Sequence, residues 1–312
     1  MPWQSAGQVA RCTGRARAQT KGGTVRRAAV GVDVGGTKML MLAQGGELLG
    51  ADISRRVGTG PETGPAELEK AIEEFLVEHR LEPTALGVAV PGLVESGRVE
   101  VSDVLPQRAG WNGPVTQAPC SLLVNDIRAA LAQETATLPV DATAAVVVCG
   151  TAVGSAYLSE GRVVRGARGW AGEIGSLPQT TPQGVRRLDE LAGGGAIVSA
   201  ARMPPGQIHT ALSTGDRRVQ AIVHAAGHAF GLALASLINM LNPHAVRVAG
   251  GTLTYRGYWD TALEAAREHS LPELWHACTV TRIDHPEPVV ARGAVRLATA
   301  MADGHAWVRQ YL

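Results

Sequence analysis

Hydrophobic positions change their spacing several times along the chain, and each spacing predicts a different element. The run A-A-V-G-V-D-V at residues 28–34 is short, apolar and rich in β-branched side chains, which predicts a buried strand. Further strands are predicted at residues 38–43, 51–57 and 85–90. Residues 65–80 have a helical period instead, with acids on the opposite face, set by Leu68, Ile72, Phe75 and Leu76.

The second half of the chain repeats the order of the first. A strand at 144–149 leads into a glycine turn at 150–154, and short strands follow at 155–158 and 162–165. The remaining pattern predicts a helix at 217–241, a strand at 245–249 and a helix at 258–268. Two copies of strand, glycine turn and strand predict a duplicated fold, and the mixture of elements indicates two α/β lobes.

Length and composition also favour two lobes. With 312 residues, of which 45% are hydrophobic, the chain can bury a large core. We expect a small N-terminal α/β lobe at 28–124 and a larger C-terminal α/β lobe at 125–312, whose last helix can return to the small lobe. Residues 1–27 contain Lys and Arg but no acid, which predicts a disordered basic leader. A transit peptide and a misassigned start codon explain that segment equally well.

Charge and cysteine spacing argue against several classes of function. The net charge is +1, so no overall basic field favours nucleic acid or an anionic membrane as partner. The apolar segment 217–241 is interrupted by His224, His228 and Asn239, which argues against a membrane span. The cysteines form no C-x-x-C pair and are expected to be idle thiols in a reducing cytoplasm: Cys12, Cys120, Cys149 and Cys278.

The segment G-V-D-V-G-G-T-K at residues 31–38 is the first candidate site. Its adjacent glycines let backbone N–H groups approach an anion, although neither G-x-x-x-x-G-K-[ST] nor G-x-G-x-x-G matches it. Asp33, at the end of the strand, is a candidate ligand for Mg²⁺ or for a metal-bound water. We interpret the segment as a phosphate-binding turn, with a plain glycine hairpin between two strands as the alternative.

Asn125 and Asp126 stand where a strand predicted at 121–124 passes into a helix predicted at 127–137. Carboxylates that take part in chemistry are common at such junctions, and so are helix N-caps. On the residues alone, Asp126 can be either.

Seven motifs follow one another in a characteristic order. They are the segment 31–38, G-V-A-V-P-G-L-V at 87–94, G-W at 110–111, N-D at 125–126, G-T-A-V-G at 150–154, R-G-A-R-G-W-A-G-E-I-G at 165–175 and A-G-G at 249–251. From about residue 28 to the end, the chain resembles the ROK family (repressors, open reading frames and sugar kinases) of the actin-like, hexokinase-like ATPase superfamily. The resemblance implies a two-lobed α/β fold, the actin-like (ribonuclease H-like) ATPase fold, with duplicated strand–turn–strand units.

The resemblance further implies an ATP-dependent kinase that phosphorylates a sugar hydroxyl, with the 6-hydroxyl of a hexose or aminohexose expected. Asp126 is the implied general base, since a carboxylate can orient the hydroxyl and accept its proton as the bond to phosphorus develops. The implied substrate-binding residues are Asn125, Asp126, Glu173, Asp189, Ser176 and Gln107.

On the ATP side, the two glycine turns are implied to hold the phosphates and a third glycine pair to contact the adenosine. Mg²⁺ is expected next to Asp33, directly or through water. The implied ATP-binding residues are Asp33, Gly35, Gly36, Thr37, Lys38, Gly150, Thr151, Gly154, Gly250 and Gly251. For the last two glycines, a helix or strand cap is the alternative.

The chain departs from the family pattern mainly on the sugar side. Zinc-containing members have a histidine and a C-x-C-G-x-x-G-C cluster after A-G-E-I-G, whereas residues 176–188 contain neither His nor Cys, so we expect no zinc. Asp189 replaces a sugar-binding Glu, Gln107 follows Pro106 where many members have Asn, and Ala152 replaces a glycine. These changes favour a specialised acceptor such as kanosamine, an aminosugar of antibiotic biosynthesis, with glucose and C7 cyclitols as alternatives.

Two other classes of function are compatible with such a fold. Repressors of the family bind DNA through an N-terminal winged helix-turn-helix, and the residues before position 28 are too few for that module. A sugar-sensing protein without catalysis is the stronger alternative, although Asp126 and the 31–38 motif argue against it. The expected partner is a small sugar, with no nucleic acid and no membrane, and a homodimer is possible.

Overall fold

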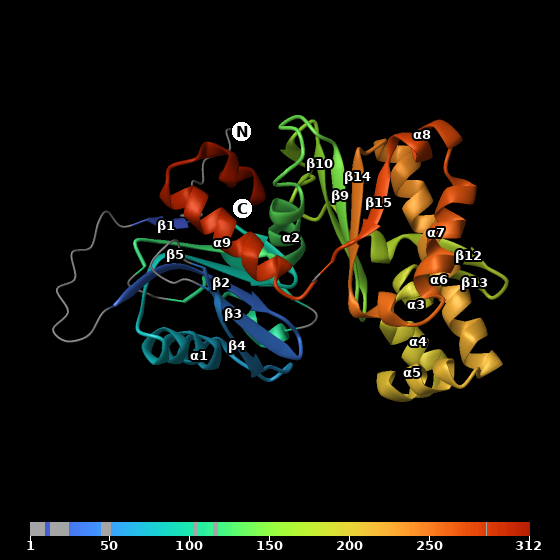
Figure 1. The fold of residues 1–312 in the computed structure, drawn as a ribbon, viewed down its shortest axis with the longest axis horizontal. Helices are drawn as coiled ribbons and strands as arrows, with labels where there is room; N and C mark the ends of the chain where they lie inside the picture. The colour runs from blue at the N-terminus through green and yellow to red at the C-terminus, as the bar shows by residue number, and fades with distance from the viewer. Residues whose placement is uncertain (1–9, 13–24, 45–50, 103–104, 115–117, 285) are drawn as a thin grey trace. The chain divides into compact units, whose positions relative to one another are not determined.

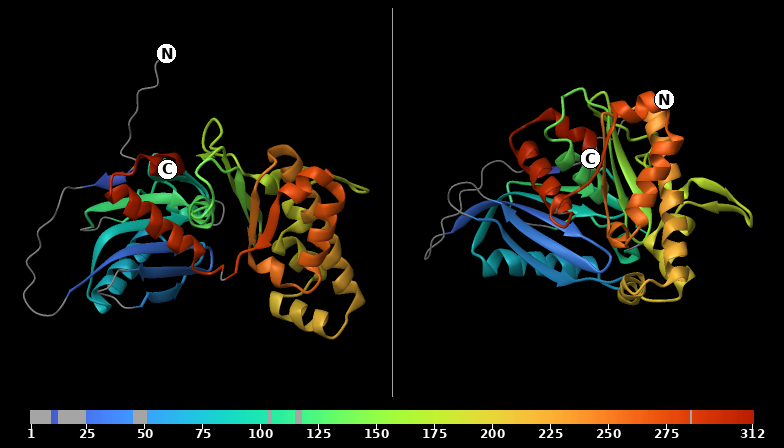
Figure 2. Two further views of the ribbon diagram at one scale, coloured as in Figure 1. Left: turned by 45° about the horizontal axis from the view of Figure 1, so that its top comes forward. Right: turned by 45° about the vertical axis from the view of Figure 1, so that its right-hand side comes forward.

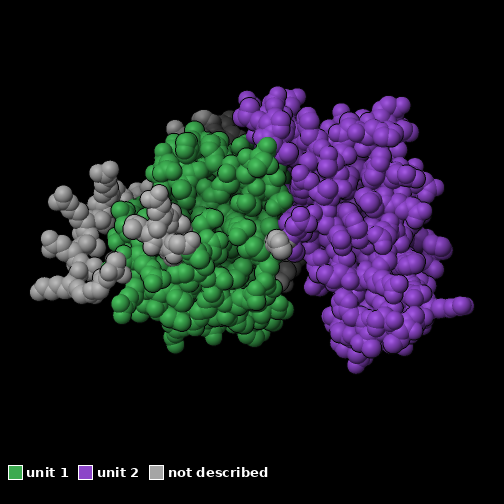
Figure 3. All heavy atoms as spheres, in the orientation of Figure 1, with its two compact units in different colours: residues 1–137, 165–170, 287–312 green, residues 138–164, 171–286 purple. Residues whose placement is uncertain are grey.

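The computed structural model divides into two compact units, and each is described by itself (Figure 3). Unit 1 consists of Met1–Thr137, Arg165–Trp170 and Glu287–Leu312, and unit 2 of Leu138–Val164 and Ala171–Pro286. The structure describes residues 10–12, 25–44, 51–102, 105–114, 118–284 and 286–312. Unit 1 continues past residue 124, where the sequence suggested a boundary, because the next helix packs on the C-terminal helix of the same unit.

Unit 1 is built on a six-stranded sheet in the order β1-β8-β5-β2-β3-β4. Strands β2, β5 and β8 are parallel, β3 and β4 continue antiparallel from β2, and β1 pairs antiparallel with β8. A separate hairpin is formed by β6 and β7. The strands are β1 (Ala10–Cys12), β2 (Arg26–Val34), β3 (Lys38–Gln44), β4 (Ile53–Gly58), β5 (Leu81–Val90), β6 (Leu93–Glu95), β7 (Arg98–Val101) and β8 (Cys120–Asn125).

Helices cover both faces of this sheet (Figures 1 and 2). Alternate residues of a strand point to opposite faces, so Met41 of β3 joins the core cluster of α1 whereas Leu42 clusters with Ala291 of α9. A third helix, α2, packs on α9. The helical elements of unit 1 are α1 (Pro65–Glu78), η1 (Pro106–Arg108), α2 (Asp126–Glu134), α9 (Val289–Ala302) and η4 (Ala306–Tyr311).

Two glycines let α9 lie directly on the central strands. A Cβ added to Gly31 in β2 would lie 2.0 Å from the carbonyl oxygen of Ala291, and one added to Gly87 in β5 would lie 2.1 Å from that of Ala294. A larger residue at either position would push α9 away from the strands. The first glycine of the 31–38 motif is therefore a packing residue.

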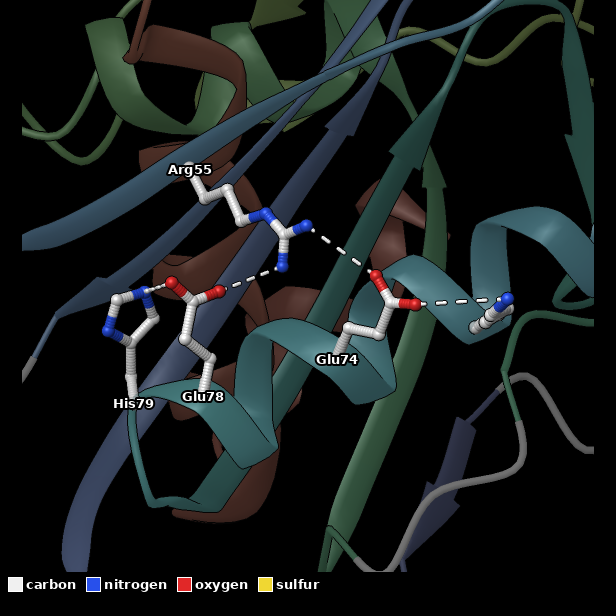
Figure 4. A network of polar contacts seen from close by, with 5 residues as sticks. Arg55, Glu74, Glu78 and His79 are labelled. Carbon is white, nitrogen blue, oxygen red and sulfur yellow. Dashed lines mark hydrogen bonds and ion pairs between the residues drawn. The ribbon is translucent and has the colours of Figure 1, made fainter.

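Arg55 of β4 connects the sheet edge to α1 (Figure 4). Its guanidinium lies 2.9 Å from Glu78 Oε2 and 3.5 Å from Glu74 Oε2, and Lys70 and His79 extend the network. Pairs as exposed as these contribute about 0–1 kcal/mol each, so α1 is held mainly by its buried apolar face.

Unit 2 is built on a five-stranded sheet in the order β11-β10-β9-β14-β15. Strands β9, β14 and β15 are parallel, and β10 pairs antiparallel with both β9 and β11. Strands β2 and β9 thus each have an antiparallel hairpin on one side and two parallel strands on the other. The predicted duplication is confirmed. The strands of unit 2 are β9 (Ala144–Cys149), β10 (Val153–Ser159), β11 (Arg162–Val163), β12 (Pro178–Thr181), β13 (Gly184–Arg187), β14 (Ala245–Ala249) and β15 (Thr279–Arg282).

The core of unit 2 lies between this sheet and a layer of helices centred on α6. By length and composition α6 could cross a membrane, alone among the helices of the described residues, but Phe230 and Leu234 on its inner face are fully buried in the core. The interrupting residues His224 and His228 are exposed. The helical elements are η2 (Ile174–Ser176), α3 (Asp189–Ala192), α4 (Gly194–Ala201), α5 (Pro205–Ser213), α6 (Arg217–Leu241), η3 (Gly251–Thr254), α7 (Tyr258–His269) and α8 (Pro272–Ala277).

The segment before residue 28 contains regular structure, in contrast to the disordered leader that the sequence predicts. Ala10–Cys12 add to the open edge of β8 as β1, with Cys12 in register with Cys120, and Arg26 begins β2. The rest of the expected leader, residues 1–9 and 13–24, lies outside the described residues. Cys120 is disulfide-bonded, so the expectation of four idle thiols was wrong for this residue. Spacing along the sequence could not show that β1 and β8 pair.

Candidate active site

The turn between β2 and β3 is held by hydrogen bonds of its own backbone. The Gly35 N–H donates to Lys38 O at 2.9 Å, and Thr59 donates from Oγ1 to Gly35 O at 2.7 Å and from its N–H to Thr37 O at 3.0 Å. A Cβ on Gly35 would lie 2.9 Å from Lys38 O, and neither Gly35 nor Gly36 has a positive φ. Close backbone approach, rather than a left-handed conformation, is therefore what requires glycine at position 35.

Lys38, the predicted phosphate ligand, is ion-paired to Glu287 just before α9. The Nζ–Oε1 distance is 2.7 Å, and Arg56 contacts the other carboxylate oxygen. The hydrogen bond from Lys38 is the main reason that the pKa of Glu287 is lowered. All three side chains are more than a third exposed, so an incoming anion can compete for Lys38 without breaking a buried ion pair.

Asp33 stands at the carboxyl end of β2, between Leu40 of β3 and Ala89 of β5. The pKa of its carboxyl group is raised to about 7, first by burial and then by the negative charge of Asp126, while Lys38 opposes the shift. Two sequence-predicted carboxylates, Asp33 and Asp126, therefore lie close enough to repel each other. A hard divalent cation would relieve that repulsion, so the residues present fit Mg²⁺.

The N-cap of α2 is Asn125. Its Oδ1 accepts a hydrogen bond from the Arg128 N–H at 3.0 Å, and its Nδ2 donates to Gly92 O at 2.9 Å. Asp126 is the first residue of the helix, where its Oδ1 accepts from the Ile127 N–H at 2.8 Å and from Asn125 Nδ2 at 3.0 Å. The N-cap, which the sequence left open as a role of Asp126, is thus provided by Asn125.

Unit 1 also contains Gln107, which lies exposed on η1. The predicted sugar contacts of Asn125 and Gln107 stay predictions, and for Asn125 the structure adds a capping role.

In unit 2, the turn after β9 is held through its carbonyl groups. Gly150 O accepts from the Gly194 N–H and from Thr252 Oγ1, both at 2.8 Å, and Thr151 O accepts from the Gly195 N–H at 3.1 Å. A Cβ on Gly194 would lie 2.8 Å from Thr252 Oγ1. The predicted phosphate turn at 150–154 is therefore fixed by the glycine run at the start of α4.

The three predicted sugar ligands of unit 2 lie at two elements, η2 and α3. Glu173 and Ser176 are exposed; Glu173 directly precedes the short helix η2, and Ser176 is its last residue. Asp189, at the start of α3, points into the unit: its Oδ1 accepts from the Val153 N–H at 2.6 Å, and a Cβ on Gly175 would lie 2.2 Å from that oxygen. Asp189 thus has a structural contact of its own, whatever it does for a sugar.

We expect Asp189→Ala to lower the free energy of unfolding by about 1–3 kcal/mol, because the N–H of the buried Val153 would lose its acceptor. Urea unfolding measures the loss. Asp141→Ala, which removes an exposed carboxylate on a turn of the same unit, is the control and should change stability by less than about 0.5 kcal/mol. Equal stability of the two variants would show that Asp189 does not hold the turn.

The backbone conformation at position 250 requires glycine. Its φ is +121°, and a Cβ would lie 2.0 Å from Cys149 O of the neighbouring strand. Gly251 has open space around its Cα and begins η3. The predicted adenosine contacts stay predictions. Next to Gly250, burial raises the pKa of the Cys149 thiol to about 11, which keeps this cysteine protonated.

No group of three or more His, Cys, Asp and Glu side chains suited to a metal ion occurs in the described part of the chain. A single carboxylate completed by nucleotide phosphates and water would not form such a group, and Mg²⁺ is commonly bound in that way.

Several site residues could not be identified from the sequence: Thr59, Thr252, Gly193, Gly194 and Glu287. The run G-G-G at 193–195 is the one clear signal that was available. Taken together, each unit presents a glycine turn at the end of its central strand, and unit 1 adds two coupled carboxylates and a cation beside its turn.

Comparison with known proteins gives a consistent picture. The family model described as ROK family matches residues 29–301. A ROK hexokinase from Thermus thermophilus has a similar structure, with a TM-score of 0.68 and 25% sequence identity over 88% of this chain and 99% of that chain. The expected actin-like ATPase fold is therefore confirmed.

Curated relatives match over different lengths. The N-acetylmannosamine kinase of Escherichia coli O157:H7 is 25% identical over 252 residues, which is 73% of this chain and 84% of the relative. The bifunctional enzyme NanE/NanK of Brucella melitensis is 30% identical over 124 residues. That match covers 38% of this chain, and the chain spans about a quarter (24%) of the length of that enzyme.

Proposed function

The chain belongs to the ROK family, and we propose on that premise that it is an ATP-dependent sugar kinase. It transfers the γ-phosphoryl group of ATP to a hydroxyl, the 6-hydroxyl in our proposal, of a hexose or aminohexose. The observation that carries the proposal is Asp126: it begins α2 without capping it, and its charge acts on Asp33 at the end of the phosphate-turn strand.

Asp126 is the proposed general base. The N–H of Ile127 and the amide of Asn125 both donate to Oδ1, which fixes the carboxylate at the start of α2, where we propose that it accepts the proton of the sugar hydroxyl. A carboxylate is too weak a base to ionise an alcohol in advance, but it accepts the proton as the oxygen bonds to phosphorus. Asn125, Gln107, Glu173, Ser176 and Asp189 are proposed to orient the sugar.

ATP is proposed to bind to backbone amides of both turns. In unit 1 the residues are Gly35, Gly36, Thr37 and Lys38, and in unit 2 Gly150, Thr151 and Gly154 together with Gly250 and Gly251. Lys38 exchanges Glu287 for a phosphate oxygen when the nucleotide binds. Mg²⁺ supplies neutralisation of phosphate charge when it is bound, and Asp33 would hold it, directly or through a water molecule.

An aminohexose is the favoured acceptor. Relatives over most of the chain are named N-acetylmannosamine kinases, which act on a hexose with a nitrogen substituent. The side chain of Asp189, whose Oδ1 accepts from the Val153 N–H, is one methylene shorter than a glutamate and so leaves room for a larger sugar substituent. Kanosamine, glucosamine and N-acetylmannosamine therefore rank before glucose.

A panel of sugars tests the proposal. Purified protein with Mg-ATP is incubated with aminohexoses, N-acetylated aminohexoses, neutral hexoses and a C7 cyclitol, and ADP release is followed together with the mass of the product. We expect ADP release that depends on one class of sugar and a product heavier by one phosphoryl group. Reactions without sugar and reactions with EDTA are the controls. ADP release from no sugar, with sugar binding still detected by calorimetry, would instead indicate a sugar sensor.

A further inference from the structure

The first turn of α2 contains a buried arginine that the proposed reaction does not use. Arg128 is 5% exposed, and its guanidinium Nη2 donates to Gly169 O at 2.6 Å. Its Nη1 is buried without a hydrogen-bond partner, and no described carboxylate forms an ion pair with it. Burial and the nearby Arg165 lower the pKa of Arg128 to about 10.

Such an arrangement is costly for stability. A buried cation normally has a carboxylate partner and a full set of acceptors, and Arg128 has one neutral carbonyl group. An apolar residue of similar size would avoid the desolvation cost. The presence of a guanidinium here therefore directs attention to the segment that accepts its one hydrogen bond.

That contact holds an unusual segment of the chain. Arg165–Trp170 belongs to unit 1, although the residues before and after it belong to unit 2. The segment fits closely against Arg128: Gly169 has a φ of +80°, and a Cβ there would lie 3.1 Å from Nη2 and 3.4 Å from Leu93. Gly169 therefore leaves just enough room for the guanidinium group of Arg128.

The chain is anchored again immediately after this segment. Gly172 O accepts from Ser155 through its N–H at 2.9 Å and through Oγ at 2.8 Å, and a Cβ on Gly172 would lie 1.9 Å from Ser155 O. Only Trp170 and Ala171 separate the two anchored glycines, so the span between them is at most about 11 Å. Glu173, a proposed sugar ligand, follows directly.

We propose that Arg128 is a positioning residue: it latches Arg165–Trp170 onto α2, next to Asp126, and so limits the movement of the chain that leads to Glu173. This role rests on the proposed kinase function. It assigns to Arg128 no contact with sugar or ATP.

The latch is tested by hydrogen exchange and kinetics of four variants. In Arg128→Met, exchange of amides in 165–172 should become about tenfold faster while 150–154 is unchanged, and kcat should fall about 10–100-fold with the KM for ATP unchanged. Arg128→Lys, which keeps a positively charged donor group, should recover part of both effects. Gly169→Ala should reproduce them with the arginine intact. Gly184→Ala is the matched control, since Gly184 also has a positive φ (+109°) but nothing within 4 Å of its added Cβ.

Combining Arg128→Met with Gly169→Ala completes the test. If both break one contact, the double variant should be no worse than the single ones in exchange and in kcat, whereas independent effects would multiply. Wild-type exchange of 165–172 in Arg128→Met would overturn the latch, and so would a lowered Tm with kcat unchanged. Hydrogen exchange needs no substrate, so absence of kinase activity would contradict the proposed function and leave the latch test intact.

Discussion

Replacement of Asp126 by asparagine is expected to lower kcat by about 10²–10⁴-fold, the usual contribution of a general base. The change removes the proton acceptor but keeps Oδ1, which can still accept from Ile127 and Asn125. The start of α2 should therefore be unaltered, and binding of the sugar, measured by calorimetry, should stay within a few-fold of wild type. The measurement is steady-state kinetics with the best sugar of the panel.

The control for this variant is Asp303→Asn, which changes an exposed carboxylate of the same unit. It should leave kcat unchanged. A kcat of Asp126→Asn within threefold of wild type would remove Asp126 from the chemistry, and loss of sugar binding in parallel with kcat would assign it to binding instead.

Much of the fold could be predicted because its signals are local. The buried run that becomes β2, the glycine turn after it and the helical period of α1 each lie within about 15 residues of sequence, and the same signals recur at β9 and β10. Recurrence of the order then predicted the duplication. Local signals also supplied the candidate site segments, whose roles in binding and catalysis stay predictions.

Contacts between distant segments could not be predicted in this way. Glu287 and Lys38 are separated by 249 positions, and no pattern in either segment indicates the other. Likewise, the glycine at position 31 looks like part of an anion-binding motif, whereas in the fold it makes room for the Ala291 carbonyl group of α9. Tertiary packing decided both roles.

The N-cap residue of α2 could not be assigned from the sequence alone. Asn and Asp are about equally good N-caps, so a helix that starts after N-D can begin at either residue. A shift of one position decides whether Asp126 is used up as the cap or remains for chemistry. The bonds from Asn125 to Arg128 and Gly92 decide in favour of Asn125, through the placement of β6 beside β8.

Replacement of Asp33 by asparagine is expected to stabilise the protein and to impair it as an enzyme. The pKa of this carboxyl group is about 7 in the folded protein and 3.8 when unperturbed, so between those values the folded state holds a proton that the unfolded state has lost. The free energy of unfolding therefore falls as pH rises from about 4 to about 7. Asparagine, which does not titrate, escapes this loss.

Between pH 5 and pH 8, in EDTA, the stability advantage of Asp33→Asn should grow by about 2–3 kcal/mol, measured by urea unfolding, with Asp303→Asn as the control that shows no such growth. Part of the shift arises from Asp126, so the growth should be smaller when Asp126→Asn is the starting protein. The same change should weaken the apparent affinity for Mg²⁺ in the kinase assay by about 10–100-fold, as expected for a ligand that acts through water. A pH-independent stability difference would contradict the burial of a charged Asp33, and unchanged Mg²⁺ dependence would remove it from the metal site. Repulsion between the carboxylates of Asp33 and Asp126 would then lower stability without contributing to catalysis.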